Sequence, residues 1–568
     1  MYVHFIFLIS DVDSNPSDDE STEIGDDSTV VIEVQCPMTA APREARANKR
    51  NLHRKWSTVQ DAESETPQFL GPDLPCCHEI LPPEQYFKLF LSDDFLDLIV
   101  RETNLYSAQK NVNKPLNVTQ KEMEQWFGLI CYFSISKLPN TTMHWCKKQS
   151  PMTDITGDIM SRDRFEAIKS NFHLLDNTLQ DAANAEKFWK IRPMIDHLRK
   201  KFQVIPKIQN LCVDEQLVPF KGRSSVKQYI PSKPKKWGYK FFVLADAKGM
   251  TYDFIPYNGK IQPVEDPAVP DLKPSANSVL HLAQIIPSNV NHLLFFDNWF
   301  TSLPLVDHLA GRGIWCCGTV RPSRLPGLTK EMKCQKQITK RGRGSFEAAK
   351  IVQDNSEAVY VKWYDNKVVN MISTFAKTEP VTTVTRFDSK QKIHIEVPRP
   401  DIVKQYNKSM GGVDLADQLI SLYRTPTRSK KNYLKLVFHM IDMTVVNSWL
   451  LYRRDASSLN LQKKEVLPLA SFKLLIAFDL MKAGKVCNGR KRGRPSLMAE
   501  SYNAPKKGCS RPSDSIRKDG MGHIPIIDEK RNRCKRNNCS GRTNVLCKKC
   551  NVNLCLNSKS NCFETYHE

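Results

Sequence analysis

The stretch from residue 211 to residue 257 contains LCVDEQLVPF at 211–220, YKFFVLADA at 239–247 and MTYDFIPY at 250–257. These segments are rich in Val, Phe and Tyr, which predicts three successive β-strands. The chain then alternates between a helix pattern and a strand pattern, in SVLHLAQII, HLLFFDNWF, SLPLVDHLAGR and GIWCCGTVR between 278 and 321. We therefore expect an α/β fold in which helices pack on a mixed sheet.

Helical patterns flank this region on both sides. Apolar residues recur at three- and four-residue spacing before the strands, at 93–106, 121–136, 162–175 and 187–202, and again after them, at 430–454 and 468–482. Between them, VYVKWYDNKVVNMIS at 359–373 suggests a small antiparallel piece. The order of the strands and helices that begin at residue 211 matches the fold of ribonuclease H.

These patterns divide the chain into eight parts. They are a disordered N-terminal region that is acidic and then basic (1–80), helical segments (81–210), a ribonuclease H-like core (211–325), a less regular stretch with the antiparallel piece (326–395), a stretch with the third aspartate (396–423), further helical segments (424–482), a basic linker (483–520) and a cysteine-rich, zinc-binding C-terminal domain (521–568).

The charge of the chain predicts a polyanionic partner. Lys and Arg exceed Asp and Glu by 22, which favours nucleic acid first and an anionic membrane surface second. We expect no membrane span, because no apolar run approaches the necessary length. The apolar start MYVHFIFLIS has no basic leader and meets Asp11 at once, so we do not expect a signal peptide.

Three aspartates are candidates for a catalytic metal site. Asp214 lies inside the first predicted strand, Asp297 ends the apolar run LLFF, and Asp414 follows Gly411-Gly412-Val413 at the expected start of a helix. A buried carboxylate is costly unless a cation compensates it, and Mg²⁺ prefers oxygen ligands. In a ribonuclease H-like sheet the first and fourth strands are neighbours and a late helix crosses them, so we expect the three to converge. Each alone is also typical of a strand end or a helix cap.

Two basic segments are candidates for DNA contact. YIPSKPKKWGYK at 229–240 combines three aromatic residues with Lys233, Lys235, Lys236 and Lys240. Lysines hold phosphates and aromatic rings stack on exposed bases, although a solvated loop is the alternative. The second segment resembles an AT-hook and also a nuclear localisation signal, and comprises Arg490, Lys491, Arg492 and Arg494 around one glycine. An inert linker is its alternative.

The C-terminal region is a candidate zinc domain. Its possible ligands are His523, Cys534, Cys539, Cys547, Cys550, Cys555, Cys562 and His567. Eight such ligands suit two tetrahedral zinc ions, and a segment this short depends on metal to fold. The CxxC at 547–550 is the strongest pair and His523 the weakest ligand. The spacing does not assign ligands to each ion, although an interleaved arrangement is expected.

Four stretches closely resemble the piggyBac transposase family, across roughly residues 80–568. They are VDEQLVPFKGR at 213–223, YIPSKPKKWGYK at 229–240, FFDNWFTSLPL at 295–305 and YNKSMGGVDLADQ at 406–418. The resemblance implies that Asp214, Asp297 and Asp414 bind catalytic Mg²⁺ or Mn²⁺, with Asp417 as a fourth acidic residue. It also implies a homodimer and a helical domain for dimerisation and DNA binding in two parts (81–210 and 424–482). The catalytic core is likewise in two parts (211–325 and 396–423) around an insertion domain (326–395), and the C-terminal domain binds transposon-end DNA.

The same resemblance implies a reaction. Family members excise their element through hairpin intermediates and insert it at TTAA, using water and then DNA 3′-hydroxyls as nucleophiles. We expect a nuclear DNA transposase without a small-molecule substrate. Two alternatives stay open: a transposase-derived, sequence-specific DNA-binding protein that does not transpose, and a chromatin-reader or ubiquitin-ligase module centred on 521–568, because RING and PHD fingers share the interleaved zinc arrangement.

Overall fold

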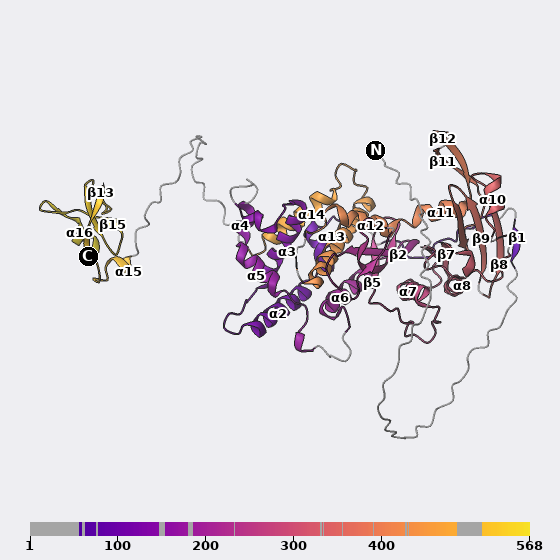
Figure 1. Ribbon diagram of the computed structural model, residues 1–568, viewed down its shortest axis with the longest axis horizontal. Coiled ribbons are helices and arrows are strands. Elements are labelled where there is room, and N and C mark those ends of the chain that lie inside the picture. The colour runs from indigo at the N-terminus through magenta and orange to yellow at the C-terminus, as the bar shows by residue number, and fades with distance from the viewer. Residues whose placement is uncertain are drawn as a thin grey trace, which may run out of the picture. The chain divides into compact units, whose positions relative to one another are not determined.

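Figure 1 shows the computed structural model of the chain. It describes residues 56–59, 63–74, 78–146, 154–179, 186–231, 233–329, 332, 334–354, 356–389, 391–426, 429, 431–484 and 514–568. The chain divides into two compact units, residues 1–485 and 486–568, and each is described by itself.

A helical body forms one part of the first unit. Its helices from the front of the chain are α1 (Pro83–Phe90), α2 (Asp93–Lys110), α3 (Gln120–Ile135), α4 (Asp154–Ile159), α5 (Arg162–Asn171) and α6 (Arg192–Gln203), with 3₁₀ turns at Thr141–Trp145, Asn177–Leu179 and Trp189–Ile191. The sequence sets the start of α3, because Thr119 and Glu122 form a reciprocal capping box there. Two late helices, α13 (Asn432–Ser458) and α14 (Leu469–Met481), complete this body.

Helices α3 and α14 lie side by side although they are far apart in the chain (Figure 1). Gly128 makes the close approach possible, because a Cβ on it would lie only 2.8 Å from the carbonyl oxygen of Ala477. The Gln125 amide donates to the carbonyl of Ala483 at 2.8 Å, across a separation of 358 residues. Trp126, fully buried, stacks on Phe172 with ring centroids 5.3 Å apart. The helices expected before and after the strands in the sequence are thus confirmed, and they share one core.

A ten-stranded mixed sheet forms the other part of the first unit. Its central strands are β2 (Asn210–Pro219), β4 (Trp237–Asp246), β5 (Thr251–Pro256), β6 (His292–Phe296) and β7 (Ile314–Thr319). They lie in the order β5-β4-β2-β6-β7, with β2 parallel to β6 and β6 parallel to β7, while β4 runs antiparallel to both β2 and β5. The helices α7 (Pro274–Ala283) and α8 (Leu303–Gly311) connect the later strands. The predicted mixed sheet is confirmed.

Antiparallel strands extend this sheet beyond β7. They are β10 (Val368–Ser373), β9 (Glu357–Tyr364), β8 (Phe346–Val352) and β1 (Ser57–Val59), while β3 (Gln228–Tyr229) pairs with β4 on the other side. The antiparallel piece expected around 359–373 therefore continues the main sheet. The disorder expected for 1–80 is wrong for β1, which pairs with β8 beside the buried Trp56.

The remaining elements of the first unit are short. They are the 3₁₀ turn Pro322–Arg324, α10 (Lys336–Arg341), the two-stranded ribbon of β11 (Thr382–Asp388) and β12 (Ile393–Arg399), and then α11 (Asp401–Ser409) and α12 (Gly412–Leu422). Helix α12 packs on β2 and β4, at the centre of the sheet. This position brings the end of the core back to its first strand.

Helix α13 is long and apolar enough to cross a membrane, contrary to the expectation that no apolar run reaches that length. Within the described residues, 89% of its apolar window is buried inside the protein. Its apolar surface is therefore covered by protein, as in the core helix of a helical body.

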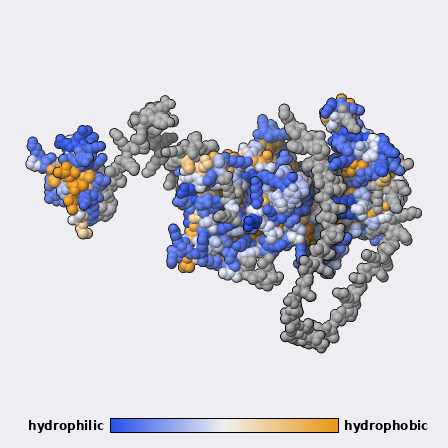
Figure 2. All heavy atoms as spheres, viewed as in Figure 1, coloured by the Kyte–Doolittle hydropathy of each residue, from blue (hydrophilic) through white to orange (hydrophobic). Residues whose placement is uncertain are grey.

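The second unit is small and has a core made largely of cysteines. It comprises α15 (Asp514–Arg517), a sheet of β13 (Pro525–Arg533), β14 (Arg542–Cys547) and β15 (Val552–Asn553), a ribbon of β16 (Leu556–Asn557) and β17 (Ser560–Asn561), and α16 (Cys562–His567). Figure 2 shows apolar atoms exposed on this unit. Large exposed apolar side chains here include Ile524 and Ile527.

Candidate active site

The sheet register brings the first two candidate aspartates together. Val213 on β2 pairs in parallel with Phe296 on β6, so Asp214 and Asp297 follow at the same level on neighbouring strands. Each aspartate is partly fixed by the local backbone. An oxygen of Asp214 accepts from the N–H of Glu215, and one of Asp297 accepts from the N–H of Trp299, each at 2.8 Å.

A glycine lets the third candidate reach them. A Cβ on Gly412 would lie 2.0 Å from the carbonyl oxygen of Asp246 at the end of β4, so only glycine allows α12 to pack this closely on the sheet. A Cβ on the neighbouring Gly411 would instead lie in open space. Asp414 follows in the first turn of α12, where the helix dipole favours a negative charge.

Asp214 and Asp297 have raised pKa values, and Asp214 lies close enough to Asp297 and Asp414 to be affected by their charges. Burial raises the pKa of Asp214 well above its usual range, and the nearby charges of Asp297 and Asp414 raise it further, while Lys233 opposes them. Burial, followed by the charge of Glu215, raises the pKa of Asp297 to about 6. Such a cluster is unfavourable without a cation, and a carboxylate donor set of this kind fits Mg²⁺ or Mn²⁺.

A lysine already lies among these carboxylates. The Nζ of Lys233 is 3.0 Å from an oxygen of Asp414. Among the described residues, the groups of three or more metal-ligand side chains whose ligand atoms all lie within 4.8 Å of one another are the two in the C-terminal unit, and the triad is not one of them. Lys233 thus lies near both Asp414 and Asp214, and the expectation that the three aspartates form one metal site stays a prediction.

Asp417, the expected fourth acidic residue, has its own partner. It lies on α12 and forms an ion pair of 3.0 Å with Arg424. Burial raises the pKa of Asp417, and Arg424 opposes that effect. The side chain is therefore held by arginine.

The four predicted DNA-binding lysines of 229–240 divide into two kinds. Lys235 and Lys236 are exposed, as expected for phosphate contact. Lys233 is paired with Asp414, and Lys240 is paired with Glu215 at 2.9 Å. Each of these two lysines thus compensates a half-buried carboxylate, and the expected contact of all four lysines with DNA stays a prediction. The predicted AT-hook residues Arg490, Lys491, Arg492 and Arg494 lie outside the described residues.

The aromatic residues of this segment form a small platform. Tyr229 and Trp237 are each about half exposed, and their ring centroids are 4.9 Å apart. The ammonium of Lys227 lies 4.7 Å from the ring centroid of Trp237. Exposed rings next to a lysine are typical of a surface that stacks on bases.

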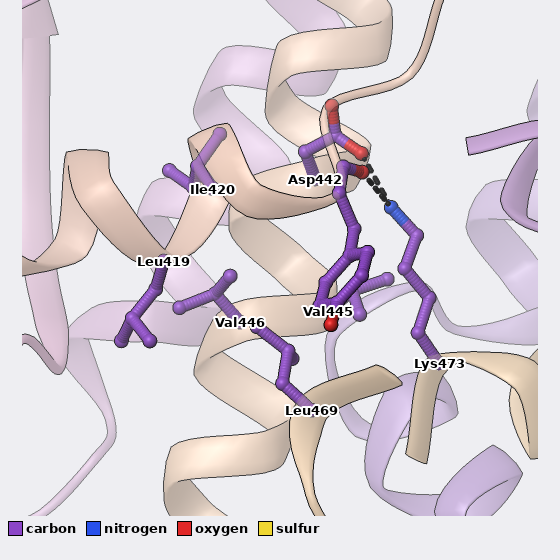
Figure 3. A pocket seen from close by; sticks show the side chains of 8 residues that line it. Leu419, Ile420, Asp442, Val445, Val446, Leu469 and Lys473 are labelled. Atoms are coloured by element: carbon purple, nitrogen blue, oxygen red, sulfur yellow. Dashed lines mark hydrogen bonds and ion pairs between the residues drawn. The ribbon is translucent and has the colours of Figure 1, made fainter. Parts of the chain in front are cut away.

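Buried polar residues of α13 contact β2 and the segment after α12, which carry or follow the candidate site residues. These polar residues were not identified from the sequence. A ring nitrogen of His439 lies 2.8 Å from the side-chain oxygen of Gln216, two residues after Asp214. Asp442 accepts two hydrogen bonds from Thr425, just after α12, and pairs with Lys473 of α14 at 2.8 Å (Figure 3). The sequence does contain a sign of them, which is the set of polar residues within the apolar pattern of 430–454. Buried polar groups need hydrogen-bond partners, so such residues indicate contacts with other elements.

The C-terminal unit gathers all eight predicted zinc ligands into two groups of four. One group is His523, Cys547, Cys550 and His567, and the other is Cys534, Cys539, Cys555 and Cys562. The ring Nδ1 of His523, the weakest candidate, lies 3.5 and 3.4 Å from the sulfurs of Cys547 and Cys550. The groups alternate along the chain, which is the interleaved arrangement expected. Thiolates and imidazoles in fours fit tetrahedral Zn²⁺.

Comparison with known proteins gives consistent matches. The family described as Transposase IS4 matches residues 82–449. PiggyBac transposable element-derived protein 3 of Homo sapiens is 30% identical over 554 residues, which cover 96% of this chain and 87% of that protein. PiggyBac transposable element-derived protein 2 of Homo sapiens is 29% identical over 460 residues, 80% of this chain and 72% of that protein.

A solved structure shares the fold. It is a cryo-EM structure of piggyBac transposase in a synaptic complex with hairpin DNA. The TM-score is 0.59 at 21% sequence identity, over 86% of this chain and 99% of that one.

Proposed function

Because the chain belongs to the piggyBac transposable element-derived protein family, we propose that it is a DNA transposase that uses divalent metal to cleave and join DNA strands. The observation that carries the proposal is the parallel pairing of β2 with β6, which sets Asp214 and Asp297 at one level of the sheet, with Asp414 in the first turn of the helix that packs on β2. Carboxylates placed on rigid strands and a helix suit phosphoryl transfer, which depends on positioning and charge stabilisation.

The strand order β5-β4-β2-β6-β7, with α12 across β2 and β4, supports a ribonuclease H-like core. Asp214 and Asp297 would hold Mg²⁺ or Mn²⁺ from the strands and Asp414 from the helix. When bound, two such ions activate the attacking oxygen and stabilise the leaving one. The chain itself fixes the carboxylates through the N–H groups of Glu215 and Trp299.

DNA is the proposed substrate, as terminal repeats of an element and a TTAA target. The exposed Lys235 and Lys236 and the rings of Tyr229 and Trp237 would contact DNA beside the carboxylates. The net charge of +22 supports a polyanionic partner. The zinc-loaded C-terminal unit would bind the ends of the element, and the basic run at 490–494 would serve as AT-hook and nuclear localisation signal. We propose a nuclear homodimer.

A second candidate function is sequence-specific DNA binding without transposition. It is favoured by the human relatives, which are named as transposable element-derived proteins. The intact aspartates favour the first candidate.

One experiment separates the two. Purified full-length protein is incubated with DNA that carries the element's own terminal repeats, in Mg²⁺ or Mn²⁺, beside the Asp297→Asn and Asp354→Asn variants. Asp354 is an exposed residue between β8 and β9 and serves as the control. A transposase nicks and joins the DNA, and Asp297→Asn loses at least about 100-fold in rate while it still binds DNA. Binding without any strand cleavage by the unaltered chain would select the second candidate.

A further inference from the structure

Lys233 turns inward from a loop whose other lysines are exposed. Its side chain is 17% exposed, and its ammonium lies 3.0 Å from Asp414, whose side chain is 33% exposed. Lys235 and Lys236 in the same loop point to solvent. Ordering a lysine side chain costs conformational entropy. The inward position of Lys233 therefore indicates that an electrostatic attraction offsets this cost.

The electrostatic reason for the inward position of Lys233 is the group of aspartate carboxylates beside it. Asp214, Asp297 and Asp414 form a half-buried cluster that is unfavourable unless a positive charge accompanies it. Other cations nearby are engaged elsewhere, because Arg424 pairs with Asp417, Lys240 pairs with Glu215, and Arg324 donates to backbone carbonyls just after Asp297. Among the described residues, the ion pair with a triad aspartate is made by Lys233.

We propose that Lys233 is the resident counter-ion of the Asp214–Asp297–Asp414 site, and that a divalent cation binds there by displacing its ammonium from Asp414. This inference rests on the proposed function, since it needs the triad to bind metal. Once displaced, the ammonium stays beside Lys235 and Lys236, where a DNA phosphate is its natural partner. One side chain then links metal loading to contact with the DNA backbone.

A counter-ion and a purely structural clamp predict different metal affinities. A positive charge that competes with the metal lowers the affinity, so its removal strengthens metal binding. A clamp that holds the loop and α12 in place supports the site, so its removal weakens metal binding. The affinity of the protein for metal, measured without DNA, therefore decides between them.

The test is calorimetric titration of Mn²⁺ into the full-length protein at pH 8, with the zinc ligands already saturated. Lys233→Met should bind Mn²⁺ at least five-fold more tightly than the unaltered chain, and its metal-free form should melt at a lower temperature. Saturating Mn²⁺ should remove most of that difference. Lys235→Met, the exposed neighbour, should match the unaltered chain in both measurements. Unchanged or weaker Mn²⁺ binding by Lys233→Met overturns the proposal.

Two further variants keep the test decisive. Lys233→Arg retains the charge, so it should fold without metal and bind Mn²⁺ no more tightly than the unaltered chain; tighter binding overturns the proposal even if Lys233→Met does not fold. Asp297→Asn should lose Mn²⁺ binding. If Asp297→Asn binds Mn²⁺ as the unaltered chain does, the proposed function fails as well. If Asp297→Asn loses Mn²⁺ binding but the Lys233 variants do not behave as expected, the counter-ion proposal fails and the proposed function stands.

Discussion

The carboxylate of Asp442 and the ammonium of Lys473 form an ion pair of 2.8 Å in which the two side chains are only 2% and 3% exposed. Figure 3 shows them pointing at each other between α12, α13 and α14. Lys473 also donates to the carbonyl of Tyr423, and Asp442 accepts from Thr425, so the pair fastens the segment that follows α12. The helical body therefore holds α12 at its C-terminal end.

Lys473→Met should destabilise the first unit by about 3 kcal/mol, because it leaves the carboxylate of Asp442 buried without its cation. The measurement is the thermal unfolding midpoint of the full chain. The double variant Asp442→Asn/Lys473→Met should recover part of the loss, since no uncompensated charge is then buried. Lys482→Met, at the exposed end of α14, is the control and should change little. A double variant that is less stable than the single one would contradict this account.

Gly412→Ala should abolish metal-dependent cleavage and destabilise the protein by a few kcal/mol, about 2–4, because the new Cβ meets the carbonyl of Asp246 and pushes α12 off the sheet. Strand cleavage and thermal unfolding are measured together. The matched control is Gly411→Ala, which places the same methyl group in open space. Equal effects of the two substitutions would show that close packing of α12 is not the reason for the glycine.

The zinc content of the full chain should be two ions. Cys547→Ser should remove one ion and Cys539→Ser the other, because the two cysteines belong to different groups. Mass spectrometry of the native protein measures the content. Cys146→Ser, an exposed cysteine of the first unit, is the control and should leave both ions. Loss of both ions in either single variant would mean that the groups fold only as a pair.

The helical body should lose stability on acidification, and His173 is one cause. Burial lowers the pKa of His173 to about 4, so the folded chain keeps the ring neutral while the unfolded chain, with an ordinary pKa near 6.5, takes up a proton. Stability is therefore full above about pH 6.5, falls as the pH drops towards 4, and changes no further below it. The largest contribution is about 3 kcal/mol.

The measurement is the unfolding midpoint at several pH values between 7 and 4. His173→Gln should show a smaller drop across that window than the unaltered chain. His394→Gln, in which an exposed ring on β12 is replaced, should keep the full drop. An unaltered slope in His173→Gln would remove this ring as a cause.

The sequence predicted the central strands because they are covered on both faces and so read as continuous apolar runs. Phe295 and Phe296 of β6 and Val213 of β2 are fully buried. Strands β1 and β3 escaped prediction, since three- and two-residue edge strands carry no periodic pattern. The three aspartates were singled out because Asp214 lies inside a strand, Asp297 directly follows one and Asp414 lies at a helix start.

The partners of these residues could not be predicted, because they depend on tertiary packing. Nothing in YIPSKPKKWGYK distinguishes Lys233 from Lys235, yet one pairs with Asp414 and the other faces solvent. Likewise, the spacing of the C-terminal cysteines fits several groupings. Only the fold places His523 beside Cys547 and Cys550.

The pairing of α3 with α14 has a consequence for biosynthesis. The ribosome must translate through Met481, the last residue of α14, before that helix can pack against α3 at Gly128. Until then the faces of α3 and α1 that pack on α14 are uncovered, and the segment after α12 lacks its hydrogen bond from Lys473. A prematurely terminated polypeptide therefore contains Asp214, Asp297 and Asp414 but lacks the helix whose Lys473 binds Asp442 and the segment after α12.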